Sequence, residues 1–150
     1  MNAEYVNPFI QGSQRVLESI VGARPGLGKV FLKKPPHEAQ PVAVAVSIIG
    51  GVKITVVYTM APKTGCFLAS HMMGGMPVEA LDAMSQSALC ELANMVSGNV
   101  ATVFSEKGVM ADISPPEFFG DSYPSLNCDA VCVPLSLQDG NIFEIDICLM

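Results

Sequence analysis

Apolar residues recur with a helical period over the first part of the chain. Between Tyr5 and Val21 they are spaced by three or four residues, which predicts an amphipathic helix. We expect Pro8 in the first turn of this helix, where its missing N–H costs nothing. Gly22 and the Arg24-Pro25-Gly26 sequence that follows it predict the end of the helix.

Two further helices are expected near the middle of the chain. A short helix is predicted over 64–73, ending at Gly74-Gly75, and a long helix is predicted over 77–105, opened by a proline. Glu79 and Asp82 fall in the first turn of the long helix, as the helix dipole favours. The face of the long helix that we expect to pack carries Leu81, Met84, Leu92, Met95 and Val103.

The segments 42–49 and 52–58 have a different pattern. They are rich in β-branched residues and are separated by Gly50-Gly51, which predicts a β-hairpin. Both strands are almost continuously apolar. This indicates either strands covered on both faces, or an exposed apolar face that a partner covers.

A second hairpin is predicted over 129–137 and 141–149, joined by the turn Asp139-Gly140. Single strands are expected over 30–32 and 109–114. The order is therefore helix, strand and hairpin, then two helices, strand and hairpin. It predicts an α+β fold in which helices pack on an antiparallel sheet, built from two pseudo-symmetric halves. We expect residues 1–150 to form a single domain.

Composition excludes several classes of protein. Half of the residues are hydrophobic and 15% are charged, which is not the composition of a disordered chain. The formal net charge is −6, and no cluster of basic residues extends beyond Lys33-Lys34. Nucleic acid and anionic membrane surfaces are therefore poor candidate partners, because both are bound largely through Lys and Arg.

The chain carries no sign of export or membrane insertion. Its first ten residues lack the basic region of a signal peptide. The longest apolar stretch, 42–52, is about half of the ~20 residues that a spanning helix needs. We expect a soluble, cytoplasmic protein.

The five cysteines and two histidines form no recognisable metal motif. An odd number of cysteines without a secretory signal argues against a disulfide framework. Cys128 and Cys132 lack the spacing of a zinc ribbon, and no second pair follows them. We expect most cysteines to be small buried hydrophobic residues. His37 is predicted to be solvated and His71 to lie on a helix surface.

A polar stripe on the long helix is the most informative feature of the sequence. At about 100° per residue, Ser87, Glu91, Asn94 and Gly98 fall on one narrow strip. Asn and Gly are poor residues for a helix interior. The stripe is therefore either a solvated face with an incidental Asn, or a surface that another molecule approaches closely.

Glu91 and Asn94 offer chemistry that suits the second interpretation. Their i, i+3 spacing lets both side chains engage one site. A carboxamide both donates and accepts hydrogen bonds and can hold a water molecule, while a carboxylate can pair with a lysine on a partner. Hydrolysis of an acyl phosphate needs little more than an attacking water held in line and stabilisation of the developing charge.

The segment 87–98 resembles the E-x-x-N helix signature of the CheC/CheX/FliY phosphatases of bacterial chemotaxis. Asn7-Pro8-Phe9 in the first helix and Asp112-Ile-Ser-Pro-Pro116 after the long helix resemble the CheX branch. CheC-like proteins carry a second E-x-x-N motif in their first helix. Here the comparable stretch begins at Glu18 and has Val21 in place of Asn, so the resemblance implies one site per chain.

The resemblance implies a phosphatase that hydrolyses the aspartyl phosphate of a CheY-type response regulator. Asn94 would orient the attacking water, and Glu91 would pair with a lysine of the regulator. The Mg²⁺ in this mechanism belongs to the regulator, so no cofactor of the chain's own is expected. CheX-like proteins form homodimers, and a dimer would cover some of the apolar strand surface. Two alternatives remain: an adaptor of the same fold that binds a response regulator or the flagellar switch without hydrolysis, and a purely structural dimeric domain.

Overall fold

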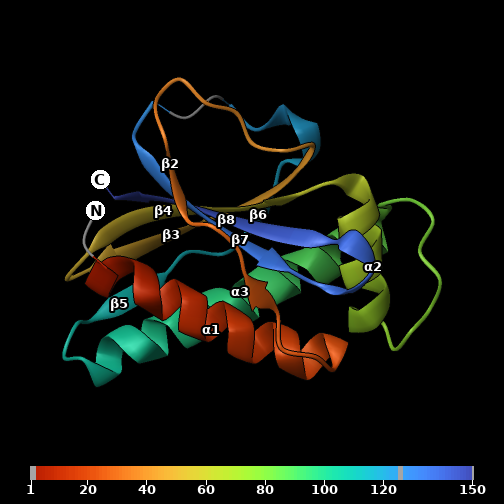
Figure 1. Ribbon diagram of the computed structural model, residues 1–150, viewed down its shortest axis with the longest axis horizontal. Coiled ribbons are helices and arrows are strands. Elements are labelled where there is room, and N and C mark those ends of the chain that lie inside the picture. Colours follow the sequence, from red (N-terminus) through yellow and green to blue (C-terminus); the bar gives the residue numbers. More distant parts are fainter. Residues whose placement is uncertain (1–2, 125–126, 150) are drawn as a thin grey trace.

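The computed structural model describes residues 3–124 and 127–149 (Figure 1). Within them the strands form one antiparallel sheet in the order β1-β7-β8-β4-β3-β5, with β2 paired to β7 and β6 to β3. The helices are α1 (Ala3–Val21), α2 (Pro62–Met72) and α3 (Ala83–Glu106). The strands are β1 (Gly26–Leu27), β2 (Phe31–Lys33), β3 (Val42–Gly50), β4 (Lys53–Met60), β5 (Ala111–Ile113), β6 (Glu117–Phe118), β7 (Ala130–Ser136) and β8 (Ile142–Leu149).

The order of the strands confirms the predicted α+β fold and its two halves. The hairpins β3–β4 and β7–β8 meet through β4 and β8 at the centre of the sheet. The strand that precedes each hairpin pairs with the hairpin of the other half: β2 with β7, and β5 with β3. This exchange joins the two halves into one sheet with one core.

One face of the sheet packs against α1 and α3, while α2 lies at one end (Figure 1). Alternate residues of β3 and β4, such as Val44, Val46 and Val56, enter the core that these helices close. The helices α1 and α3 touch at Gly12, where a Cβ atom would lie 3.1 Å from the backbone nitrogen of Val100. Among the described residues, no helix combines the length and apolar character needed to cross a membrane.

The structure corrects three expectations about the helices. The long helix begins at Ala83 rather than at residue 77, because the Asp82 carboxylate caps it by accepting hydrogen bonds from the Ser85 backbone N–H and hydroxyl at 2.9 and 2.8 Å. These bonds lower the pKa of Asp82. Helix α1 begins at Ala3, so Pro8 lies in its second turn and not in its first. Met84 was expected on the packing face of the long helix but is exposed.

The strand expectations hold except at the sheet edges. The short edge strands β1 and β6 were not predicted, because two-residue strands leave no periodic pattern. Gly50 and Gly51 join β3 to β4 as expected. Because they have no side chains, they also let the backbone before β5 approach closely. A Cβ atom on Gly50 would collide with the carbonyl of Met110, and the Gly51 N–H donates to that same carbonyl at 2.8 Å.

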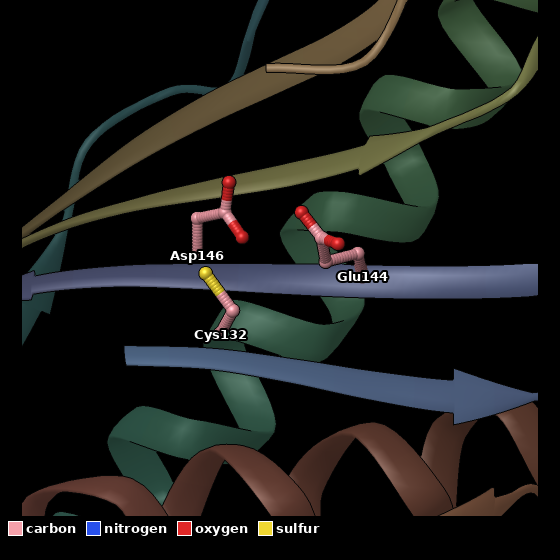
Figure 2. Close-up of side chains that lie close together, drawn as sticks. All are labelled: Cys132, Glu144 and Asp146. Carbon is pink, nitrogen blue, oxygen red and sulfur yellow. The ribbon is translucent and has the colours of Figure 1, made fainter. Parts of the chain in front are cut away.

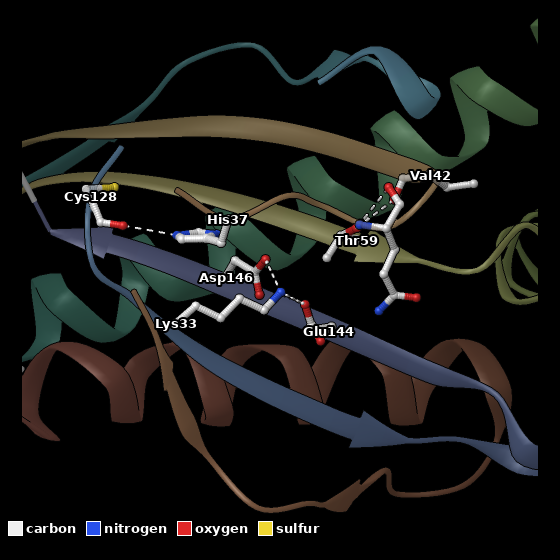
Figure 3. A network of polar contacts seen from close by, with 8 residues as sticks. Lys33, His37, Val42, Thr59, Cys128, Glu144 and Asp146 are labelled. Carbon is white, nitrogen blue, oxygen red and sulfur yellow. Dashed lines mark hydrogen bonds and ion pairs between the residues drawn. The ribbon is translucent and has the colours of Figure 1, made fainter. Parts of the chain in front are cut away.

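The other face of the sheet carries a buried group of charged side chains. Lys33 of β2 places its Nζ 2.8 Å from Glu144 Oε2 and 3.2 Å from Asp146 Oδ2, both on β8 (Figure 3). Burial, together with the neighbouring Glu144, raises the pKa of Asp146 to about 7. Burial lowers the pKa of Lys33, but the two acids outweigh this effect and raise it overall.

The described residues of the connections that precede β3 and β7 cover this face, so the hairpin over 42–60 is largely buried on both faces, except near its turn, where Ile49 is exposed. They are fixed by polar contacts. The His37 Nε2 donates to the Cys128 carbonyl at 3.0 Å, and the Gln40 N–H donates to Thr59 Oγ1 at 2.7 Å (Figure 3). His37 is therefore half-buried and hydrogen-bonded rather than solvated, which corrects the expectation from its Pro-rich surroundings.

A buried hydrogen bond ties α3 to the sheet. The Tyr58 hydroxyl of β4 and the Ser97 hydroxyl of α3 lie 2.8 Å apart, and both side chains are buried. The Tyr58 ring stacks on Phe143 of β8 at a centroid distance of 5.6 Å. Burial raises the pKa of Tyr58, so the hydroxyl stays protonated and can donate.

We predict that Tyr58→Phe lowers the free energy of unfolding by about 1–2 kcal/mol, because it leaves the buried Ser97 hydroxyl without a partner. Ser97→Ala should cost a similar amount. The double variant should cost less than the sum of the two, since neither hydroxyl then remains unpaired. Urea unfolding of the four proteins measures this. Strict additivity would show that the bond contributes nothing to the packing of α3.

Candidate functional site

The polar stripe lies on the exposed side of α3. The buried side of the helix, which includes Leu92, Val96 and Val100, is directed at the sheet and α1. With that side fixed, Glu91 and Asn94 must face outward, and both are exposed, as is Ser87. Gly98 is half-buried, with open space where a Cβ atom would lie. The predicted stripe is thus a surface rather than part of the core.

A groove of about 730 Å³ runs along this stripe. One wall is α3, and the other is the segment that joins β5 to β6. The α3 wall consists of Ala83, Gln86, Ser87, Cys90, Glu91 and Asn94. The opposite wall consists of Ile113, Ser114, Pro115, Pro116 and Phe118. The Asp112–Pro116 segment singled out in the sequence is therefore brought beside Glu91 and Asn94.

The opposite wall exists because the sheet edge is interrupted there. The Ser114 N–H donates to the Ser47 carbonyl, and the Ser114 hydroxyl accepts from the Ser47 N–H, both at 2.9 Å. Pro115 and Pro116 then have no N–H to offer β3, so regular pairing stops between β5 and β6. Two adjacent prolines also restrict the backbone, which makes this wall stiff.

The groove has almost no charge of its own. Among the described residues that line it, Glu91 is the one carboxylate, and no lysine, arginine or histidine is present. Burial raises the pKa of the Cys90 thiol, so it stays neutral at physiological pH. A phosphoryl group placed here would find no cation, whereas a lysine on a partner would find a carboxylate.

Glu91 and Asn94 are free to act on a partner. Within the described part of the chain, neither side chain makes a hydrogen bond or an ion pair with another residue. Asn94 therefore keeps both its carbonyl acceptor and its amide donors available. Both residues stand on a 24-residue helix held by the core, so their positions are set by a rigid element.

The structure brings no other candidate residue to this groove. His71 lies exposed on α2 against the Phe67 ring, as predicted. In α1, Glu18 is exposed but Val21 is buried, so the stretch 18–21 presents no second carboxylate–carboxamide pair. Sequence reasoning missed Gln86, Cys90 and Phe118 as groove residues, because their common surface forms only when β5 and β6 dock beside α3.

The chain is similar in sequence to known proteins. The chain matches the family model of the chemotaxis phosphatase CheX over residues 42–136. It is 30% identical to the CheY-P phosphatase CheX of Thermotoga maritima over 116 residues, which cover 77% of this chain and 75% of that protein.

Solved structures show the same fold. A CheC-like superfamily protein from Shewanella sp. PV-4 has a TM-score of 0.86 and 23% identity, covering 100% of this chain and 99% of that one. A chain of the CheX–CheY–BeF₃–Mg²⁺ complex from Borrelia burgdorferi has a TM-score of 0.80 and 28% identity, covering 97% of each chain.

Proposed function

Because the chain belongs to the CheX family of chemotaxis phosphatases, we propose that it hydrolyses the aspartyl phosphate of a CheY-type response regulator. In this proposal Asn94 orients the attacking water, and Glu91 pairs with a lysine of the regulator. The observation that supports both roles is the exposed, unpartnered pair of side chains on a rigid helix beside a groove without cations.

The chemistry asks little of the enzyme beyond positioning. A water oxygen attacks phosphorus in line with the departing aspartate carboxylate, and the P–O bond to that carboxylate breaks as the new bond forms. Asn94 can accept a hydrogen bond from the water and donate one to a phosphoryl oxygen. A large part of the free-energy barrier is the entropy lost when a free water molecule is placed and oriented for attack. Holding the water beforehand removes this part of the barrier.

The charge of the groove suits a reaction completed by two proteins. Developing negative charge on the phosphoryl group needs cations. The described groove residues provide none, so we propose that Mg²⁺ and lysine come from the regulator. The Borrelia complex contains CheX, CheY and Mg²⁺ together, which supports this division of roles.

We also propose that the chain forms a homodimer through the edge of the sheet at β1 and β2. The exposed apolar residues there are Leu27, Val30, Phe31 and Leu32. Together with the N-terminal half of α1, β2 borders an apolar groove of about 450 Å³. The apolar hairpin over 42–60 was the earlier candidate for a dimer face, but apart from Ile49 its large apolar side chains are buried within the chain.

We predict that Asn94→Ala reduces the acceleration of regulator dephosphorylation by roughly a hundredfold or more, because the attacking water loses its orientation. The melting temperature should not fall, since the side chain is exposed and Ala is the better helix former. The measurement follows the decay of a phosphorylated CheY-type regulator with catalytic amounts of each protein.

Asn99→Ala is the matched control for this variant. Asn99 lies on the same helix, but its side chain contacts the Met95 carbonyl instead of the groove. Its activity should equal that of the parent. Full activity in Asn94→Ala would overturn the role of Asn94. Regulator binding without acceleration by the parent protein would favour the adaptor.

We predict that Glu91→Ala weakens binding of the phosphorylated regulator by about tenfold, because the regulator lysine loses its partner. The loss should shrink as salt is raised, since the pair forms at a solvent-exposed rim. Fluorescence anisotropy of a labelled regulator measures this. Glu106→Ala, another exposed carboxylate on α3, should bind like the parent. Equal affinities of all three proteins would contradict the lysine pairing.

We predict that Leu32→Glu converts the dimer to a monomer, because it places a charge in the apolar edge between two copies. Light scattering after size exclusion measures the molar mass. Ile49→Glu introduces the same charge at an exposed apolar position on β3 and should leave the mass unchanged. A monomeric parent protein at micromolar concentration contradicts the dimer proposal.

A further inference from the structure

Three side chains with different metal-binding atoms meet on the sheet face opposite α1 and α3 (Figure 2). They are Cys132 on β7, and Glu144 and Asp146 on β8. The Cys132 sulfur and one carboxylate oxygen from each acid all lie within 4.8 Å of one another. Pairing of Cys132 with Asp146 across the two strands places both on one face, and Glu144 is the next residue on that face.

This cluster is built into the sheet rather than lying on its surface. All three residues are buried. In a tetrahedral zinc site with bonds of about 2.0–2.3 Å, neighbouring ligand atoms are roughly 3.3–3.8 Å apart. The cluster therefore needs side-chain adjustments of only about an ångström to reach that geometry, with no change in the strands.

In the structure, the Lys33 ammonium lies beside the carboxylates where a metal ion would bind. It contacts one oxygen of each acid, at 2.8 and 3.2 Å. The second oxygen of Asp146, Oδ1, is buried and has no hydrogen-bond partner among the described residues, and the Asp146 side chain is 0% exposed. Buried carboxylate oxygens are rarely left unpaired, because the loss of hydration is costly. The cluster thus has more capacity for a cation than one ammonium uses.

We propose that Cys132, Glu144 and Asp146 form a site for a borderline divalent cation, best matched by Zn²⁺, that binds in place of the Lys33 ammonium. A thiolate with two carboxylates and one open position is a donor set that zinc accepts. Mg²⁺ and Ca²⁺ prefer six or more oxygen ligands and fit poorly.

The exchange balances in charge. At a pH above the Asp146 pKa of about 7, where Asp146 is ionised, a neutral thiol, two carboxylates and one ammonium sum to −1. On binding, the Cys132 thiol releases its proton to solvent, the metal enters and the ammonium withdraws. A thiolate, two carboxylates and a divalent cation again sum to −1. The buried charge is therefore the same before and after the exchange.

Lys33 can leave without disrupting the sheet. It lies on β2, a three-residue edge strand, and its side chain is already 20% exposed. The long, flexible lysine side chain reaches solvent while its backbone stays paired with Ala130. The Lys33 ammonium thus competes with the metal for the two carboxylates. This gives the proposal its sharpest consequence: removal of a residue that is not a ligand should improve binding.

The test uses the untagged, reduced chain of residues 1–150, titrated with Co²⁺ as a spectroscopic probe and then with Zn²⁺ in competition. We expect one Co²⁺ per chain, with near-ultraviolet charge-transfer absorption from a thiolate ligand, and displacement by Zn²⁺. Cys132→Ser should abolish that absorption and weaken binding by about tenfold or more. Cys66→Ser, which removes a thiol on α2 outside the cluster, should bind like the parent.

Lys33→Met distinguishes this site from adventitious thiol binding. It should bind Co²⁺ about tenfold more tightly or better than the parent, because no ion pairs have to be broken first. Zn²⁺ should also raise its melting temperature by more than that of the parent. The gain should vanish in Lys33→Met combined with Cys132→Ser, which separates it from non-specific binding by a loosened chain.

Three results would each overturn the proposal. The first is no charge-transfer absorption in either the parent or Lys33→Met at one equivalent of Co²⁺. The second is absorption that persists in Cys132→Ser. The third is binding to Lys33→Met that is no tighter than to the parent, since Lys33 would then not occupy the metal position.

Discussion

The rotational setting of α3 on the sheet is the constraint on which the candidate site depends. Residues of one helix are displaced by about 100° from one to the next, so a rotation by a single position would turn the stripe toward α1 or the sheet. Apolar contacts of Leu92, Val96 and Val100 favour a range of rotations, because dispersion forces have little directionality. The bond between Ser97 and Tyr58 is directional and lies at the border of the buried side. It selects the rotation that leaves Glu91 and Asn94 outside.

The local pattern of the sequence was sufficient for the candidate site, because its two residues are neighbours on one helix. The common exposed face of Glu91 and Asn94 could be predicted, since an i, i+3 relation depends only on helical geometry. The hairpins could be predicted equally well, because runs of β-branched residues flank clear turn residues. The start of α3 was not, since Pro77 and Asp82 both resemble helix N-termini, and the hydrogen bonds from Ser85 decide between them.

Features that depend on strand register could not be predicted from the sequence. The wall formed by Pro115 and Pro116 becomes part of the site only because β5 and β6 both pair with β3, one on each side of the prolines. Cys132 and Asp146 are separated by fourteen positions and are brought together by the register of β7 with β8. Lys33 comes from the other half of the chain. A search for metal motifs by spacing therefore passes over this cluster.

The two faces of the sheet are stabilised in different ways. The face toward α1 and α3 is closed by apolar packing, which needs no exact charge balance. On the opposite face the connections that precede β3 and β7 rest on polar contacts such as His37 with Cys128 and Gln40 with Thr59. Beneath them lie Glu144 and Asp146, whose negative charge the Lys33 ammonium offsets in part, and a buried carboxylate without a cation is strongly destabilising. The covering of this face therefore depends on the ion pairs of Lys33 with Glu144 and Asp146, whereas the α3 surface that carries Glu91 and Asn94 is supported by the apolar core on the other side. Chemistry at the two places can change independently, because the sheet separates them.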